Sequence, residues 1–301
     1  MIPVVARTAS PLRTGWREAL PAQRAAAGVG LALVAVGLLQ GLLWLLLGGS
    51  AEGPLSWRKP VTFGISFGIT TLTLAWVSSH LALPRRWVTA SLVVVAAANT
   101  CEVTWVTLQH ARGVPSHFNQ ETSLDGALFI ANGVAIAATV AVIAVYTVCS
   151  FVRPSAPPAL ALGLRVGLLL LLVSMATGVW MILREMAFGL PPTQVAPGGS
   201  VKALHAVGMH GLQVVAVLAW VLSSVAVPEA SRVRLVATAA AGYVLLTGSV
   251  AVLTLSGASP LGGGAGGWTV RLLAVALVAG PWSVAAVAVG AALRDGRHRD
   301  G

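Results

Sequence analysis

One acidic residue lies deep inside a long apolar stretch of the chain. Glu102 stands about seven residues, or ~10 Å, inside the outer end of the third predicted membrane span. A carboxyl group at that depth is costly and normally has a proton, a partner or contact with water. Asn99 and Gln109 fall on the same helical face, so a polar stripe leads from the surface to Glu102. The pattern predicts a proton-handling group, although a protonated glutamic acid bonded to a neighbouring helix would also explain it.

Two histidines in a later apolar stretch are candidates for binding a metal ion or a cofactor. His210 has about the same predicted depth as Glu102, ~12 Å, and we expect it to be the counterpart of that carboxyl group. His205 and His210 are five residues apart, about 140° around a helix, so one regular helix cannot direct both at a single metal ion. Each alone could bind a metal ion or b-type haem, or form an interhelical hydrogen bond. A second polar stripe here, a candidate cofactor-binding surface, consists of Lys202, His205, Met209 and Gln213.

The segment that follows the third apolar stretch is the most polar part of the chain, and long ordered loops are often functional. We assign Arg112 and His117 of this loop, together with Glu102, as candidate catalytic residues. Thr122 and Asp125 precede an apolar run and predict a capping box rather than a catalytic pair. The other polar residues assigned to the predicted site are His110, Asn119, Glu121, Lys59 and Arg184. Its cationic members could hold a carboxylate, a haem propionate or a lipid phosphate, or simply extend to the membrane interface.

The elements that position these residues are predicted to be membrane-spanning helices. Hydrophobic residues make up 56% of the 301 residues and charged residues only 9%. Soluble domains carry about 25% charged residues, so a water-soluble globule of this size is excluded. The apolar runs have the length of helical spans rather than of barrel strands. They predict an all-α integral membrane protein with spans at residues 25–47, 61–83, 87–108, 127–151, 159–183, 201–227, 233–255 and 268–293.

The distribution of charge predicts which ends of these helices face the cytoplasm. If both chain termini lie inside, 13 of the 19 basic residues fall on the inner side, in agreement with the positive-inside bias. The net charge of +10 then reflects helix ends and contact with membrane lipids, not a nucleic-acid surface. We therefore expect a multi-pass protein of a bacterial-type cytoplasmic (inner) membrane. Its predicted parts are a basic N-terminal segment (1–24), a transmembrane domain (25–293) with an outer loop (109–126), and a basic tail (294–301).

A faint internal repeat also marks the chain. Residues 74–79 read LAWVSS and residues 218–224 read LAWVLSS, and each follows a lysine, Lys59 or Lys202, at the start of its span. Two four-helix halves of the same orientation would explain this, as in transporters built from parallel repeats, although chance similarity is at least as good an explanation. The only cysteines, Cys101 and Cys149, fall towards opposite faces of the membrane and are not expected to form a disulfide.

These observations leave three functional hypotheses. The first is a redox protein that binds haem b or a quinol near the outer face, with ligands among its outer histidines and Met209. The number of helices and the chain length are similar to those of haem A synthases, but the fourth and eighth spans contain no histidine, so no family is assigned. The second is a proton-coupled transporter of a small molecule that uses Glu102. The third is an intramembrane metal-dependent hydrolase, which no ligand spacing supports.

Overall fold

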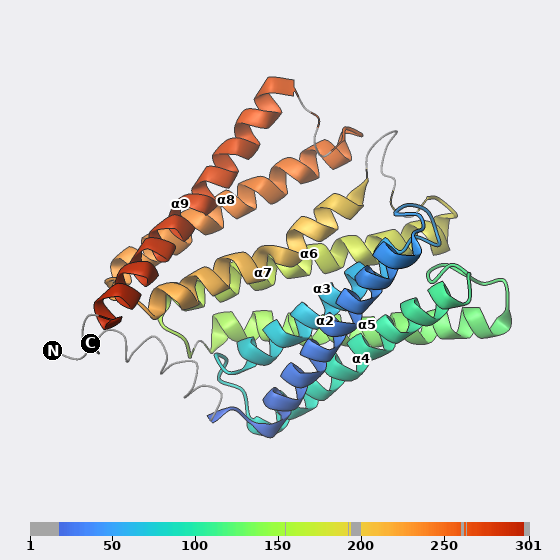
Figure 1. The fold of residues 1–301 in the computed structure, drawn as a ribbon, viewed down its shortest axis with the longest axis horizontal. Coiled ribbons are helices and arrows are strands. Elements are labelled where there is room, and N and C mark those ends of the chain that lie inside the picture. Colours follow the sequence, from blue (N-terminus) through green and yellow to red (C-terminus); the bar gives the residue numbers. More distant parts are fainter. Residues whose placement is uncertain are drawn as a thin grey trace. The chain divides into compact units, whose positions relative to one another are not determined.

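The structure is a computed structural model that describes residues 18–153, 155–191, 193, 200–259, 262 and 264–297. Every long element in this part of the chain is a helix (Figure 1). Eight of them are long and apolar enough to cross a membrane, which confirms a multi-pass, all-helical architecture for the described residues. Most of the predicted N-terminal segment and half of the predicted tail lie outside the described residues. The inside location of both termini remains a prediction.

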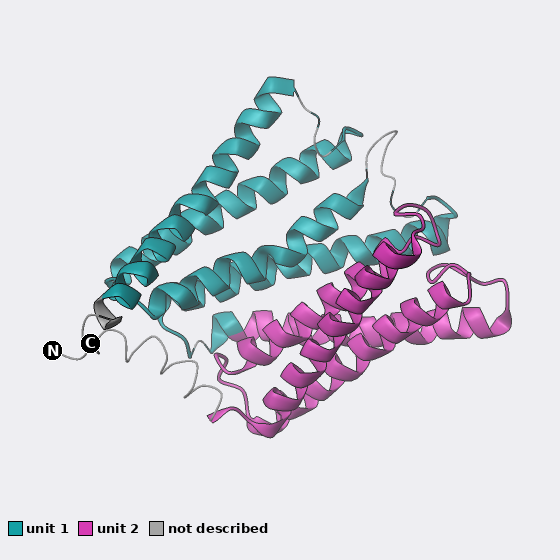
Figure 2. Cartoon of the chain, in the orientation of Figure 1, with its two compact units in different colours: residues 1–17, 150–301 teal, residues 18–149 magenta. Residues whose placement is uncertain are grey.

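The helices form two compact units (Figure 2). Unit 2 covers Glu18–Cys149 and contains α2 (Pro21–Leu47), α3 (Arg58–Ser78), α4 (Arg85–Ala111) and most of α5 (Ser123–Val152). Unit 1, in its described part, begins at Ser150. It contains α6 (Pro158–Phe188), α7 (Val201–Ser223), α8 (Glu229–Leu255) and α9 (Gly264–Arg297). The division therefore falls near the C-terminal end of the fourth span that the sequence predicts.

Glycines allow the first two helices of each unit to pack closely. In unit 2, a Cβ atom added to Gly64 of α3 would lie 2.6 Å from the Cα atom of Gly37 of α2. In unit 1, a Cβ atom added to Gly167 of α6 would lie 2.5 Å from the Cα atom of Leu212 of α7. Small residues let helix backbones approach in this way, and dispersion contacts then replace the hydrophobic driving force that lipid does not supply.

Two helices end earlier than the sequence predicts, and both ends carry a serine bonded to a carbonyl group of the last turn. α3 ends at Ser78 and α7 at Ser223, although the apolar runs continue for four or five residues. In α3 the hydroxyl of Ser79 donates to the carbonyl oxygen of Trp76, and in α7 the hydroxyl of Ser223 donates to that of Trp220. These bonds satisfy carbonyl groups of the last turn, which lack intrahelical partners. The similar segments therefore have the same local role, while the four-plus-four repeat itself remains a prediction.

Candidate functional site

Polar side chains line the contact between α4 and α5 over nearly the full length of both helices. On α5 they recur every seven residues, at Asp125, Asn132, Thr139 and Tyr146. Each of the four forms a hydrogen bond with a side chain of α4, namely Gln109, Glu102, Asn99 and Ser91 respectively. We call these four layers the polar seam. A spacing of seven keeps side chains on one helical face, which explains why one stripe of α5 serves all four layers.

Glu102 belongs to the second layer and is almost completely buried. Only 3% of its side chain is exposed, and its two carboxylate oxygens have different partners. Nε2 of His117 lies 3.2 Å from Oε1, and Nδ2 of Asn132 donates to Oε2. The carboxyl group thus has the partners that its depth requires, and both come from unit 2. His210, the counterpart expected from the sequence, belongs to unit 1.

His117 connects this buried carboxyl group to the loop between α4 and α5. About 27% of its side chain is exposed, and its ring packs edge-on against Phe63 of α3, with 5.3 Å between the ring centroids. Its Nδ1 atom lies 3.0 Å from the hydroxyl oxygen of Ser116. The two ring nitrogens therefore contact a hydroxyl group and a carboxylate. An imidazole held in this way can accept a proton on one side and donate one on the other.

The two deeper layers contain no formal charge. Asn99 is fully buried, donates to the hydroxyl of Thr71 at 2.8 Å, and accepts a weak hydrogen bond from Thr139. In the deepest layer the hydroxyl groups of Tyr146 and Ser91 are 2.8 Å apart. Between these layers the fully buried Val95 of α4 and Ile143 of α5 interrupt the polar seam. The gap corresponds to eight residues of α4, or ~12 Å.

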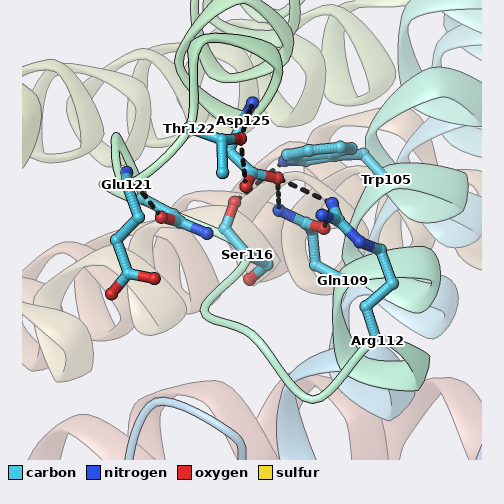
Figure 3. Close-up of polar contacts among 8 residues, drawn as sticks. Trp105, Gln109, Arg112, Ser116, Glu121, Thr122 and Asp125 are labelled. Carbon is cyan, nitrogen blue, oxygen red and sulfur yellow. Dashed lines mark hydrogen bonds and ion pairs between the residues drawn. The ribbon is translucent and has the colours of Figure 1, made fainter.

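The outer layer centres on Asp125, which accepts hydrogen bonds from three side chains (Figure 3). Arg112 and Gln109 donate to Oδ1 at 2.6 and 2.9 Å, and the hydroxyl of Thr122 donates to Oδ2 at 2.7 Å. The backbone N–H of Asp125 donates in turn to Thr122, as at the first turn of a capped helix. This geometry agrees with a structural role for Asp125, and it engages Arg112, a predicted catalytic residue, in an ion pair that joins α4 to α5.

The rest of the loop is fixed by two further contacts, which involve Trp105, Ser116 and Glu121 (Figure 3). Nε1 of Trp105 donates to the carbonyl oxygen of Ser116 at 2.8 Å, and the backbone N–H of Glu121 donates to the side chain of Asn119. The Glu121 carboxylate is exposed and points away from Asp125. Nδ2 of Asn119 is buried and has no hydrogen-bond partner among the described residues. The loop is therefore an ordered structure that carries His117 to Glu102.

Other predicted members of the outer site lie beside this loop. The ring of His110 packs edge-on against Trp57, with 4.4 Å between the ring centroids. Nζ of Lys59 lies 3.4 Å from the carbonyl oxygen of Pro54. Both residues are half-buried. They place an imidazole and a cation near the ends of α3 and α4, on the same side of the unit as the loop.

In unit 1, the predicted cofactor residue His205 has a well-defined environment on α7. Its Nδ1 atom lies 2.7 Å from the carbonyl oxygen of Ser174 on α6 and 3.1 Å from the hydroxyl oxygen of Thr177. Because a carbonyl oxygen can only accept, Nδ1 carries the proton and the neutral ring presents a lone pair at Nε2. No hydrogen bond joins Nε2 to any residue that the structure describes. This is the orientation in which histidine serves as a metal ligand.

The remaining predicted residues of unit 1 differ in their environments. His210 and Lys202 are exposed, while Met209 and Gln213 are half-buried. Arg184 of α6 lies over the ring of Trp180 and donates to the carbonyl oxygen of Pro191. Within the described parts of the chain, no three His, Cys, Asp or Glu side chains are grouped to hold a metal ion. The predicted metal and cofactor ligands therefore remain individual candidates.

His80, which follows α3, gives a test of pH-dependent stability outside the helices that can span the membrane. Burial lowers the pKa of His80 below 6.5, against a hydrogen bond to the Trp76 carbonyl that raises it. The unfolded chain then binds a proton more readily, so stability should be complete above pH 6.5 and fall as the pH drops below it. We expect the melting temperature of the wild type in detergent to decrease between pH 7.5 and 5. The decrease should be smaller for His80→Gln, and equal decreases would contradict this role.

Several residues of the site were not identified from the sequence, chiefly Asn132, Thr139 and Ser116. The seven-residue recurrence of polar side chains in α5 is a signal that could have revealed the first two. For Ser116 no comparable pattern exists, because its contact depends on the path of the loop.

Comparisons with protein-family models, with curated proteins and with solved structures give no match to this chain.

Proposed function

We propose that this protein is a proton-coupled transporter of a small molecule, with Glu102 as the group that takes up and releases the proton. The observation that carries the proposal is the contact between the buried Glu102 carboxylate and His117, within a polar seam that extends along two helices able to span a membrane. Ionisable groups inside membranes are expensive and commonly belong to proton relays or substrate pathways.

The chemistry of the pair suits reversible protonation. When the imidazole is protonated, its contact with Glu102 is an ion pair, and transfer of the Nε2 proton to Oε1 gives two neutral groups. A proton can then move within the pair without creating an isolated charge in the membrane, which would cost far more. Asn132 is compatible with both the ion pair and the pair of neutral groups. Its amide nitrogen donates to the carboxylate, and its Oδ1 atom has no partner among the described residues.

The polar seam provides a path for protons where the sequence offers no charged residues. The inner halves of the predicted spans contain almost no charged residues, so no charged path across the membrane is evident. The seam continues the path with hydroxyl and amide groups, through Asn99 and Thr139 to Ser91 and Tyr146. The apolar interruption at Val95 and Ile143 argues against a permanently open proton channel. It suits a transporter that exposes its site to one side at a time.

Reactivity with a carbodiimide tests this role without knowledge of the substrate. Dicyclohexylcarbodiimide modifies protonated carboxyl groups in apolar surroundings, so we expect it to label Glu102 in detergent-purified protein, and more slowly as the pH rises. In proteoliposomes with an entrapped pH dye, one member of a panel of small solutes should change the internal pH, and prior labelling should abolish that change. Labelling independent of pH, together with no solute-dependent proton flux, would refute the proposal.

We further propose that the loop end of unit 2 faces the extracytoplasmic side of a bacterial-type inner membrane. The support is the excess of arginine at the opposite helix ends, which is typical of cytoplasmic ends. With both native cysteines replaced, a cysteine at the exposed Glu121 should react with a membrane-impermeant maleimide added to intact cells. Reaction only after the cells are opened would reverse the orientation.

A redox function is the second candidate, and the geometry of His205 is the observation that favours it. The Nδ1 proton is held by the Ser174 carbonyl, so Nε2 is presented as a ligand atom of the kind that binds haem iron. Haem b would supply one-electron chemistry, and the His117–Glu102 pair could accept protons from a quinol. Gly178 lies beside the imidazole, where an added Cβ atom would be 3.4 Å from Cε1.

Absorption spectroscopy tests this second candidate. If haem binds, purified protein supplied with haem should show a Soret band and sharp bands on reduction with dithionite. His205→Ala should lose them, and the matched variant His210→Ala should keep them, because His210 lacks the orienting carbonyl contact. A featureless spectrum from folded wild-type protein would exclude haem at His205.

A further inference from the structure

A small cavity lies beside the Glu102 site, within unit 2. Its polar lining residues are Ser56, Lys59, His110 and Ser116, which come from the start of α3, the end of α4 and the loop that carries His117. Its volume is about 10 Å³. Ser56 is fully buried, and its hydroxyl oxygen has no hydrogen-bond partner among the described residues. A buried polar atom without a partner is uncommon and points to a bound polar species.

The dimensions and the chemistry of the cavity fit one water molecule. A cavity needs roughly 10–15 Å³ to hold a water, and the water needs two to four polar partners. The hydroxyl groups of Ser56 and Ser116, the ring of His110 and the ammonium group of Lys59 provide them. The apolar part of the lining, which includes Val106 and Val114, leaves no room for a larger ligand.

We infer that this cavity binds a single water molecule that links His110 to Ser116 and so completes a proton relay from the loop surface to Glu102. The inference rests on the proposed function, because it assigns the route by which protons reach the same carboxyl group. The later steps of the relay are contacts already described. The hydroxyl of Ser116 lies 3.0 Å from Nδ1 of His117, and Nε2 of that ring lies 3.2 Å from Glu102.

Each group in the relay receives one proton and gives one. His110 donates a proton to the water, the water donates one of its own to Ser116, and the Ser116 hydroxyl passes its proton to Nδ1 of His117. Nε2 of His117 then donates its own proton to Glu102. The water, Ser116 and His117 each gain one bond to hydrogen and lose one. The half-exposed His110 ring can recover its proton from solvent.

Two cations belong to the same end of unit 2 as the relay. Lys59 lines the cavity itself, and Arg112 is neutralised in part by its ion pair with Asp125. A cation at the cavity attracts the lone pairs of the water. The O–H groups of the water then point away from the cation, towards Ser116. That orientation favours transfer in the direction of His117.

Hydrogen–deuterium exchange of the Glu102 carboxyl group tests the relay, with infrared spectroscopy after rapid transfer into D₂O at a pH where the group is protonated. Ser116→Ala breaks the relay, and Ser56→Val fills the cavity. We expect each of these two variants to slow the exchange at least tenfold. Ser56→Ala removes one partner of the water without filling the cavity, and we expect it to slow the exchange by a smaller factor. Ser50→Ala, at an exposed hydroxyl outside the cavity, is the matched control and should exchange at the wild-type rate.

The possible outcomes separate this inference from the proposed function. If Glu102 titrates but folded Ser116→Ala and Ser56→Ala both exchange as fast as the wild type, the relay is refuted while the proton-binding role of Glu102 stands. If the wild-type carboxyl signal does not change with pH, the proposed function fails and the relay fails with it. A high-resolution map with a density peak between the two serine hydroxyls would support the water directly, and a dry cavity would overturn it.

Discussion

Glu102→Gln should abolish carbodiimide labelling and reduce solute-dependent proton flux at least ~100-fold, with little loss of folded protein. The size of the effect follows from the chemistry, since a positioned proton donor or acceptor contributes about 10²–10⁴-fold to rates. The glutamine side chain keeps the shape of glutamate, its single oxygen can accept from His117, and its amide can donate to the Oδ1 atom of Asn132 once that amide turns over, so the hydrogen bonds between α4 and α5 should survive. Proton flux in proteoliposomes and the yield of monodisperse protein are the two measurements.

A matched variant separates proton chemistry from packing. Asn99→Leu changes a fully buried residue one turn away on the same face of α4 and removes no titratable group. It should lower stability, because Asn99 donates to Thr71, but it should leave the carbodiimide labelling of Glu102 in place. If Glu102→Gln instead lost most of its folded protein, the carboxyl group would be structural and the transport proposal would fail.

Asp125→Ala should destabilise the protein by about 2–3 kcal/mol, the largest stability effect expected from a single change in this loop. The substitution removes the acceptor of three side-chain hydrogen bonds and leaves the buried Gln109 amide without its partner. Loss of a partner that leaves a buried donor unsatisfied costs about 1–3 kcal/mol, and breaking a buried ion pair costs about 3–5 kcal/mol. We expect a value within the lower range because the Arg112 side chain is 38% exposed and can be solvated.

Reversible unfolding in mixed micelles measures this effect, and the loop provides its own control. Glu121→Ala removes an acidic side chain four residues away that is exposed and forms no ion pair in the described structure. It should change the free energy of unfolding by less than ~0.5 kcal/mol, as most surface substitutions do. Equal effects of the two variants would mean that Asp125 does not fix the loop.

The sequence was sufficient to predict the helices but not the contacts between them. Apolar runs of membrane length identify all eight helices that the structure describes, because the bilayer sets that length. The early ends of α3 and α7 were missed, because the apolar runs continue beyond Ser78 and Ser223 and hydropathy does not mark where a helix ends. The polar face of Asn99, Glu102 and Gln109 was recognised from its spacing, and the structure shows that this face meets α5.

The partners of Glu102 could not be predicted because they depend on three-dimensional neighbours. From depth alone His210 was the best candidate, but depth says nothing about which helices lie side by side. The structure instead pairs Glu102 with a loop residue and with Asn132, an amide that looks unremarkable in an apolar run. Arg112 was assigned to catalysis as a residue of the polar loop with no evident structural role. Its ion pair with Asp125, thirteen residues later in the chain, was not visible in the sequence.

The seven-residue spacing on α5 also bears on how the hairpin assembles after its helices enter the bilayer. Inserted helices can slide along each other before they settle, and lipid offers no strong apolar reason to stop at one position. A slip of α5 by one repeat, ~10 Å, would bring Asp125 to the level of Glu102 and set carboxylate against carboxylate. In the observed register each of the two carboxylates instead meets a side-chain amide. The same side chains that could move protons therefore also fix the register of the two helices.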